Sequence, residues 1–154
     1  MLEIPIYLVV LGAMGLVAVT GYVCAQRHLN IMDAVFLMAG PRATMMEYKA
    51  VTGAWPTSNG QAGFSDAMFR TGDPDLYRVD SVQIRERGAV DFGLSSSALK
   101  GKILSIRAWE SLGSGLPVAW ICGHANSPPG TGAAAPDRTS LSEEDLPSPC
   151  RAHR

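Results

Sequence analysis

Residues Ile4 to Gln26, with the sequence IPIYLVVLGAMGLVAVTGYVCAQ, contain no charged side chain. As one α-helix this run reaches roughly 35 Å, enough to cross a hydrocarbon layer about 30 Å thick. The alternative is a cleaved signal peptide, but such a peptide has a basic start and a shorter apolar run, whereas this chain starts Met1-Leu2-Glu3. The stretch therefore predicts a membrane-anchored helix.

The helical pattern continues beyond this run, to about Thr52. Apolar residues recur at helical spacing among polar ones: Ile31, Val35, Met38, Met45 and Met46. Gly53 then supplies a helix stop, with Pro56 shortly beyond it. The pair Gly40-Pro41 predicts a kink, because proline removes one backbone hydrogen bond and its ring clashes with the preceding turn.

Four candidate strands follow a loop that is rich in turn residues. They are Val79–Arg87, Ala89–Leu94, Lys102–Trp109 and Pro117–Gly123. Polar and apolar residues alternate along them, so each strand has one apolar face, and short sequential strands form an antiparallel meander. That face needs a cover, which only the amphipathic helix supplies. Residues 127–135, rich in Pro, Gly and Ala, are expected to be neither strand nor helix.

The predicted fold is α+β: a long, partly transmembrane N-terminal helix packed on a four-stranded antiparallel sheet. The chain divides into a transmembrane or assembly half of the helix, its outer amphipathic half, a helix-to-sheet loop, and the sheet with the C-terminal region. These units cover residues 1–26, 27–52, 53–78 and 79–154, respectively.

The charge balance argues against a general affinity for nucleic acid, because the net charge is −1 and the pI is about 6.3. Arg70, Arg78, Arg85 and Arg87 are the candidates for a DNA-binding patch. Strand alternation places Arg85 and Arg87 on one face, but the overall charge favours a solvated face over a DNA site. The three tryptophans are expected to be core residues rather than a sugar-binding platform: Trp55, Trp109 and Trp120.

The sequence lacks several common enzyme motifs. It contains no Gly-rich phosphate loop ending in Lys-Ser or Lys-Thr, no His-Glu-x-x-His and no Gly-x-Ser-x-Gly. The histidines form no obvious base–nucleophile pair. We therefore expect neither an enzyme nor a cofactor.

The three cysteines divide into Cys24, inside the apolar run, and a distal pair, Cys122 and Cys150. The pair has three possible states: a disulfide, two free thiols, or a zinc site with His124 and His153. Cys-x-His is an unusual spacing for structural zinc. A disulfide would close a loop of about 28 residues and hold a tail whose composition gives it little other reason to stay folded.

Several segments resemble the type IV pilins. Met46–Lys49 and Gly53–Asn59 are similar to the end of the pilin long helix and the start of the following αβ-loop, and Leu99–Leu104 is similar to the entry of the third strand. Ala119–Cys122 and Leu146–Arg151 are similar to the two ends of the pilin C-terminal D-region. A Trp two residues before the first Cys and a Leu-Pro turn before the second are the most specific features.

The resemblance implies a Cys122–Cys150 disulfide that bounds the C-terminal loop. It also implies a structural subunit that polymerises through its apolar helix into a surface fibre for adhesion, motility or DNA uptake. The partners would be further copies of the chain, the pilus assembly machinery and a membrane. The subunit would be anchored in the inner membrane before assembly, with its globular part periplasmic or extracellular, and in the surface fibre afterwards.

The start of the chain differs from the pilin pattern, which has a basic leader ending in Gly and a Glu at the fifth mature position. Here the early carboxylate is Glu3. The resemblance implies that Glu3 neutralises the N-terminal amine of a neighbouring subunit. The alternative functions are a minor or unprocessed pilin-like binding protein that stays in the membrane and captures DNA or a partner protein, and a secretion-system pseudopilin.

Overall fold

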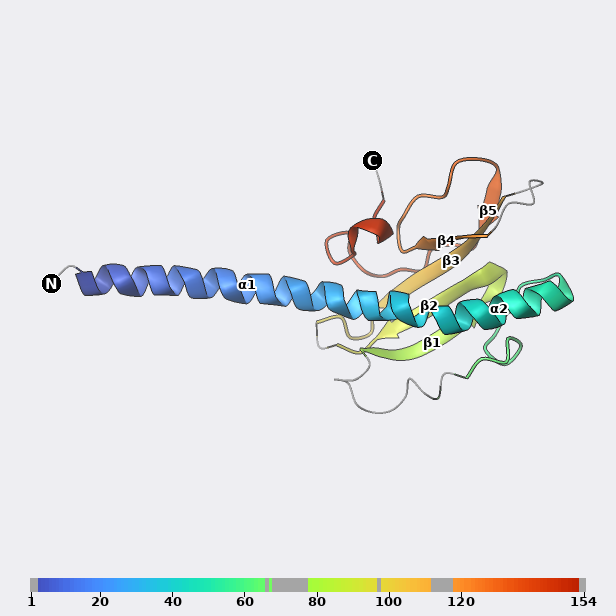
Figure 1. Cartoon of the computed structure of the whole chain (residues 1–154), viewed down its shortest axis with the longest axis horizontal. Coiled ribbons are helices and arrows are strands. Elements are labelled where there is room, and N and C mark those ends of the chain that lie inside the picture. Colours follow the sequence, from blue (N-terminus) through green and yellow to red (C-terminus); the bar gives the residue numbers. More distant parts are fainter. Residues whose placement is uncertain (1–2, 66, 68–77, 97, 112–117, 153–154) are drawn as a thin grey trace.

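The computed structural model describes residues 3–65, 67, 78–96, 98–111 and 118–152. A helical rod lies along one face of an antiparallel sheet, and the N-terminal part of the rod extends away from the rest of the molecule (Figure 1). The rod consists of α1 (Glu3–Leu37) and α2 (Ala39–Thr52). We refer to the described residues from Ile31 onward as the head, and to residues 4–26 as the free half of α1.

The rod breaks where proline forbids a continuous helix. α1 ends at Leu37, four residues before Pro41, because Pro41 has no N–H to donate to the Leu37 carbonyl and its ring clashes with that oxygen. The backbone bonds resume at once, since the Arg42 N–H donates to the Met38 carbonyl at 2.9 Å. The predicted kink is confirmed.

The end of the rod also follows the sequence prediction. α2 ends at Thr52, and Gly53 adopts φ 77°, a left-handed conformation that costs glycine little. The Gly53 N–H donates to the Lys49 carbonyl at 2.8 Å and so satisfies one of the carbonyls at the helix end.

The sheet is an antiparallel meander, as predicted, with the strand order β1-β2-β3-β4. The strands are β1 (Val79–Arg85), β2 (Ala89–Leu94), β3 (Ile103–Ser111) and β4 (Ala119–Cys122). A further strand, β5 (Gly132–Ala134), pairs with β3, so the sheet has five strands rather than four. The expectation that residues 127–135 contain no strand is therefore wrong.

β5 forms because part of β3 has no other partner. Trp109 of β3 pairs with Ala119 of β4 and also with Ala134 of β5, so β4 and β5 lie on opposite edges of β3. β2 occupies the β5 edge only as far as the pairing of Ala89 with Arg107. The backbone groups beyond that point need partners, and β5 supplies them despite the weak strand propensity of Gly and Ala.

β1 is shorter than predicted. It ends at Arg85, and residues Glu86–Gly88 form a 3-10 turn, η2, in which Arg87 adopts φ 58°. Arg87 therefore does not continue the strand, and the expectation that Arg85 and Arg87 share one strand face is wrong.

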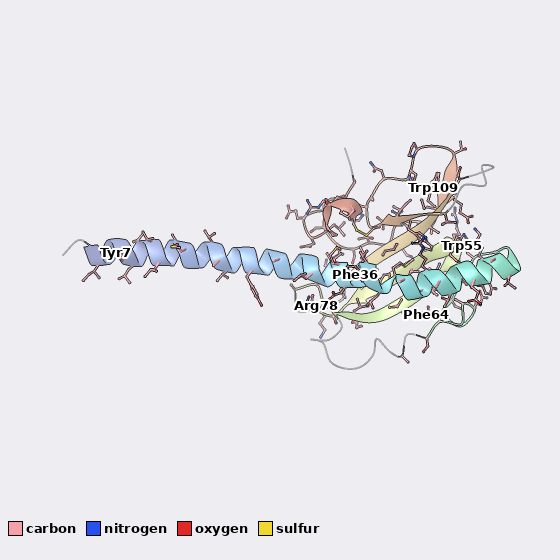
Figure 2. The ribbon with its side chains drawn as sticks, viewed as in Figure 1. Tyr7, Phe36, Trp55, Phe64, Arg78 and Trp109 are labelled. Carbon is pink, nitrogen blue, oxygen red and sulfur yellow. A yellow bond between two sulfur atoms is a disulfide. The ribbon has the colours of Figure 1, made fainter. Side chains whose placement is uncertain are left out.

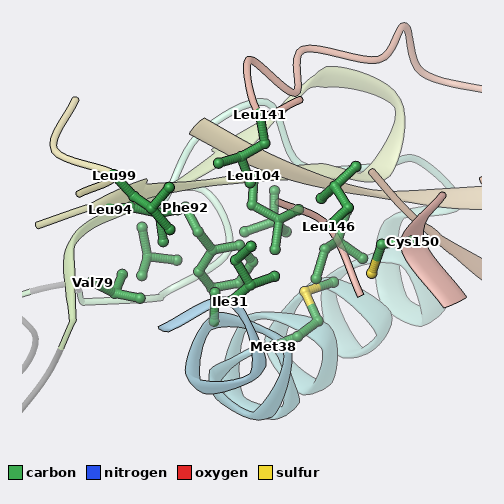
Figure 3. Packing of buried hydrophobic residues seen from close by; sticks show 14 of the residues in the cluster. Ile31, Met38, Val79, Phe92, Leu94, Leu99, Leu104, Leu141, Leu146 and Cys150 are labelled. Atoms are coloured by element: carbon green, nitrogen blue, oxygen red, sulfur yellow. The ribbon is translucent and has the colours of Figure 1, made fainter. Parts of the chain in front are cut away.

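The core lies between the rod and the sheet (Figure 3). The rod contributes Ile31 and Ala34 of α1, Met38 between the two helices, and Met45 of α2. The sheet contributes residues that the alternation predicted, including Val90, Phe92, Leu94, Leu104 and Ile106, and the C-terminal region adds Leu141 and Leu146. Full burial of one such side chain stabilises the fold by about 1.5–3 kcal/mol. The rod is thus the predicted cover of the sheet.

Aromatic and cationic side chains attach α2 to the sheet beside this core. Trp55 meets Trp120 edge-on, with ring centroids 6.1 Å apart. Lys49 Nζ lies 4.2 Å from the Trp55 ring centroid and forms an ion pair with Glu110 of β3. Trp109 is buried and the other two tryptophans are partly buried, so the interpretation of the tryptophans as core residues fits.

Candidate assembly surface and C-terminal loop

The free half of α1 exposes large apolar side chains. Their exposed fractions range from 49 to 73%, for Ile4, Tyr7, Leu8, Val9, Val10, Leu11, Met14, Leu16, Val17, Val19 and Tyr22. Figure 2 shows this half extending from the head, with Tyr7 near its free end. A helix that is apolar around its circumference is normally buried, and a patch of this size on a soluble monomer marks an interaction site.

Sequence analysis predicted that this half of α1 spans a membrane. Among the described residues, no helix meets the length and hydropathy that a membrane span requires. Glu3 is the first residue of α1. The structure does not describe the Glu3 side chain, so its predicted assembly contact lies outside the described part of the chain.

The head has an exposed apolar side chain and a groove where the rod bends. Phe36 is 73% exposed and borders a groove of about 360 Å³ that Met38 and Ala39 line on the rod side. Trp120 and Cys122 of β4 line the opposite side. Figure 2 shows Phe36 at the junction of rod and head. The sequence pattern did not mark Phe36, because it lies one residue outside the apolar stripe that faces the core.

The C-terminal loop is closed by a disulfide between Cys122 and Cys150. We call residues 122–150 the D-region. The chain must reverse sharply beside the bridge, and Gly123 does so at φ 54°. A Cβ at this position would lie 2.8 Å from the Cys150 carbonyl oxygen, so only glycine fits. The disulfide-bounded loop of the predicted fold is present.

A polar cluster fastens the D-region to the sheet. His124 Nδ1 lies 2.7 Å from Asp137 Oδ2, and His124 Nε2 lies 3.0 Å from the Leu141 carbonyl oxygen. Arg107 of β3 donates to the Gly123 carbonyl at 2.7 Å, and its Nη2 lies 4.0 Å from Asp137 Oδ2. Both ring nitrogens of His124 face acceptors, so the arrangement is complete only when the imidazole is protonated.

The cluster shifts two pKa values in directions that favour this ion pair. The bond to the Leu141 carbonyl raises the pKa of His124 above its ordinary 6.5; burial opposes the shift, and Asp137 and Glu143 reinforce it. Burial alone would raise the pKa of Asp137. The hydrogen bonds from Thr139 and His124 and the charge of Arg107 together outweigh burial. They lower the pKa of Asp137 below its ordinary 3.8.

The zinc alternative does not fit this geometry. Cys122 and Cys150 are joined to each other, and His124 is bonded to Asp137 and Leu141. Among the described residues, no group of three or more His, Cys, Asp or Glu side chains is placed to hold a metal ion. His153 lies outside the described residues.

Among the arginines proposed for a DNA patch, Arg78 and Arg85 lie at opposite ends of β1. Arg78 lies 3.7 Å from Asp33 of α1, whereas Arg85 donates to Asp91 at 3.1 Å near the far end of β1. Arg70 lies outside the described residues.

The sequence patterns did not predict the side chains that position the αβ-loop and the D-region. Asn59 of the αβ-loop donates to the Val82 carbonyl at 2.8 Å and accepts from the Ile84 N–H, so its amide pairs with the edge of β1. In the sequence, Asn59 stands out only as part of a loop that is rich in turn residues. His124 and Asp137 are thirteen positions apart, and no local sequence pattern predicts their contact.

Comparisons with known proteins agree with the fold. The sequence matches no protein-family model. It is 29% identical to a fimbrial protein of Neisseria meningitidis serogroup B, over 98% of this chain and 91% of that protein. It is 28% identical to a type IV major pilin protein, PilE1, of Neisseria gonorrhoeae, over 98% of this chain and 84% of that protein. This similarity along nearly the whole chain, together with the helix-on-sheet fold and the disulfide-bounded loop, supports a type IV pilin.

Proposed function

We propose that this protein is a structural subunit of a type IV pilus and that it polymerises through the free half of α1. The observation that carries the proposal is the exposure of large apolar side chains along that half, on a rod whose outer part already packs one face against the sheet. Parallel copies of the free half would cover one another in the axis of a fibre, with the heads outside. The relatives named fimbrial protein and type IV major pilin support this role.

Association of this kind needs no catalytic group. Apolar area removed from water contributes about 25 cal/mol per Å², so a bundle of such helices is held by burial and packing alone. The groove beside Phe36 lies on the same rod as the free half of α1, and the free half of a second copy is its proposed occupant. The proposed partners are thus further copies of the chain and the machinery that assembles them.

Before assembly, the same apolar half would be held in the inner membrane, with the head on its outer side. The disulfide is consistent with an oxidising compartment. In this proposal Glu3 pairs with a positive group of a neighbouring subunit. Adhesion, motility or DNA uptake would be properties of the finished fibre.

The test is a charge in the free half. Leu11→Lys places an ammonium group where the proposal requires a buried apolar contact, and Leu11 is 64% exposed in the single chain. The matched control is Ala43→Lys, at an exposed position of α2. We expect Leu11→Lys to abolish fibres, counted by electron microscopy in a strain with the assembly machinery, and the control to leave them.

The outcomes separate the candidate functions. Normal fibres from Leu11→Lys would contradict polymerisation through the free half. No fibres from the unmutated chain, with the protein retained in the membrane, would favour the pilin-like membrane-held binding protein.

A further inference from the structure

The head has a hollow lined by arginines at the end opposite to the free half of α1. The hollow has a volume of about 440 Å³ and lies between the αβ-loop, the η2 turn and the segment after β5. Three guanidinium groups line it, those of Arg85, Arg87 and Arg138. We call it the arginine pocket. It was not visible in the sequence, because Arg138 is more than fifty residues from the other two.

The arginine pocket carries more positive than negative charge. The carboxylate of Asp91, which is buried, accepts from Arg85 Nε at 3.1 Å and lies 3.6 Å from Arg138 Nη1. One carboxylate is therefore shared by two cations and fixes their positions. Arg87 has no ion pair or hydrogen bond within the described part of the chain. With Glu86 at the rim, the cluster keeps a net charge of about +1, and its guanidinium groups are preorganised for a carboxylate.

The opposite end of the head presents acidic residues. Residues 142–145, Ser-Glu-Glu-Asp, form what we call the acidic loop, and Glu143 and Glu144 are exposed. Arg151 lies beside this loop but donates to backbone carbonyls, those of Leu146 at 2.6 Å and Glu144 at 3.4 Å. The carboxylate of Glu144 has no partner among the described residues. The loop thus carries an excess of negative charge.

The strand register places the two features at opposite ends of the sheet. The acidic loop follows Ser140, whose N–H donates to the Ile103 carbonyl at the start of β3 at 3.0 Å. The arginine pocket adjoins Ala89, which pairs with Arg107 in the second half of β3. In Figure 1 the acidic loop, beside the red C-terminal turn, lies toward the free half of α1, and β5 lies toward the far end.

Opposite charges at opposite ends of one chain fit each other on two copies that point the same way. Such a contact joins different surfaces of the two copies, so it propagates as a ring or a helical filament instead of closing as a twofold dimer. Parallel packing of the free halves also requires copies that point the same way. We infer that the arginine pocket receives the acidic loop of another subunit of the fibre; this inference rests on the proposed function.

The contact sets the register of the subunits, because charged contacts contribute to specificity more than to affinity. A reversed or slipped neighbour would place arginine against arginine or glutamate against glutamate. The burial of the apolar helices has no comparable preference for one axial position.

Charge reversal tests the contact. Arg87→Glu and Glu144→Arg should each lower the fibre yield about tenfold, because like charges brought together across an interface are strongly disfavoured. The double variant should return the yield to within about threefold of the unmutated chain, since the pair is restored with its signs exchanged. The matched controls are Lys100→Glu and Glu47→Arg, exposed charges outside both features, which should assemble normally. Arg87→Gln, a milder change, should give an intermediate yield.

Fibre yield is counted by electron microscopy, and circular dichroism of each purified chain in detergent checks that the head is folded. Single reversals that assemble normally, or a double variant worse than either single one, would overturn the contact while the proposed function stands. A shift of duplex DNA in gels that is lost in Arg87→Glu, with fibre yield unchanged, would assign the pocket to nucleic acid instead. No fibres from the unmutated chain would overturn the proposed function and the contact with it.

Discussion

His124 is the residue through which pH acts on the D-region. Its two ring nitrogens face a carboxylate and a carbonyl, so loss of its proton removes one of the two bonds that hold residues 137–141 in place. Asp137 is the matching anion, and Thr139 and Arg107 keep it charged. The complete set of hydrogen bonds forms only while both groups are ionised.

The expected pH dependence follows from the two shifts. The pKa of His124 is raised by folding, so its contribution is complete below about pH 6.5 and is lost as the pH rises through the folded value. The pKa of Asp137 is lowered, so its contribution is complete above about pH 3.8 and is lost as the pH falls through the folded value. The free energy of unfolding, measured by denaturant titration of the full chain in detergent, should be lower at pH 8.5 than at pH 5.5.

A His124→Gln variant should show a smaller difference between these two pH values, since its side chain does not titrate. Asp137→Asn should be less stable than the unmutated chain at both. An unchanged pH dependence in His124→Gln would mean that another group carries it.

The Cys122–Cys150 bridge makes a second prediction at the residue scale. It closes a loop with a sequence separation of 28, and Cys150→Ser should lower the free energy of unfolding by roughly 3–4 kcal/mol in the chain-entropy model. The measurement is denaturant unfolding with and without a reducing agent. Cys24→Ser is the matched control, and reduction should destabilise it as much as the unmutated chain. Equal stability of Cys150→Ser and the unmutated chain would contradict the prediction.

At the scale of elements, α1 contains a boundary between two surroundings. Ile31 and Ala34 are fully buried against the sheet, whereas the large apolar side chains of the free half are exposed. The helix is continuous across this boundary, so one element serves both the head and the proposed assembly. Its first half contributes little to the core of the head.

Removal of residues 1–26 should therefore yield a soluble monomer that keeps its fold, because every core residue of the rod remains. Size-exclusion chromatography with light scattering reports the mass, and near-ultraviolet circular dichroism reports tertiary packing. A matched deletion of residues 1–35 also removes Ile31 and Ala34, and should unfold or aggregate. An insoluble product from the shorter deletion would place the boundary elsewhere.

The elements predicted from the sequence are those whose side chains repeat with a clear period. The rod, its kink at Pro41 and its end at Gly53 follow from helical spacing and from two residues with special backbones. β5 was missed because Gly and Ala carry no strand pattern, and its pairing depends on how far β2 extends along β3. The arginine pocket and the His124–Asp137 pair depend on the folded chain bringing distant residues together, which no local pattern encodes.

At the scale of the whole molecule, the distribution of surface chemistry has a direction. One end is an apolar helix, and the far end of the head carries the arginine pocket. The acidic loop lies between these two ends, on the side of the head nearer the helix. A molecule whose two ends differ in this way favours assemblies in which every copy points the same way, as in a filament.

Glu3 is the strongest test of how such copies meet at their apolar ends. If the free halves form a bundle, a carboxylate at the first residue of α1 is surrounded by apolar helices and must pair with a positive group of a neighbour. Glu3→Ala would leave that group unpaired, at a cost of up to several kcal/mol for each contact, since the uncompensated charge stays buried. Because every subunit repeats the contact, the number of fibres should collapse while the head folds normally.

Electron microscopy counts the fibres, and immunoblots measure the unassembled subunit. Glu47→Ala, an exposed carboxylate on α2, is the matched control and should assemble as the unmutated chain does. Fibres in normal number from Glu3→Ala would show that this carboxylate has no part in assembly, and would leave burial of the apolar side chains as the force that joins the subunits.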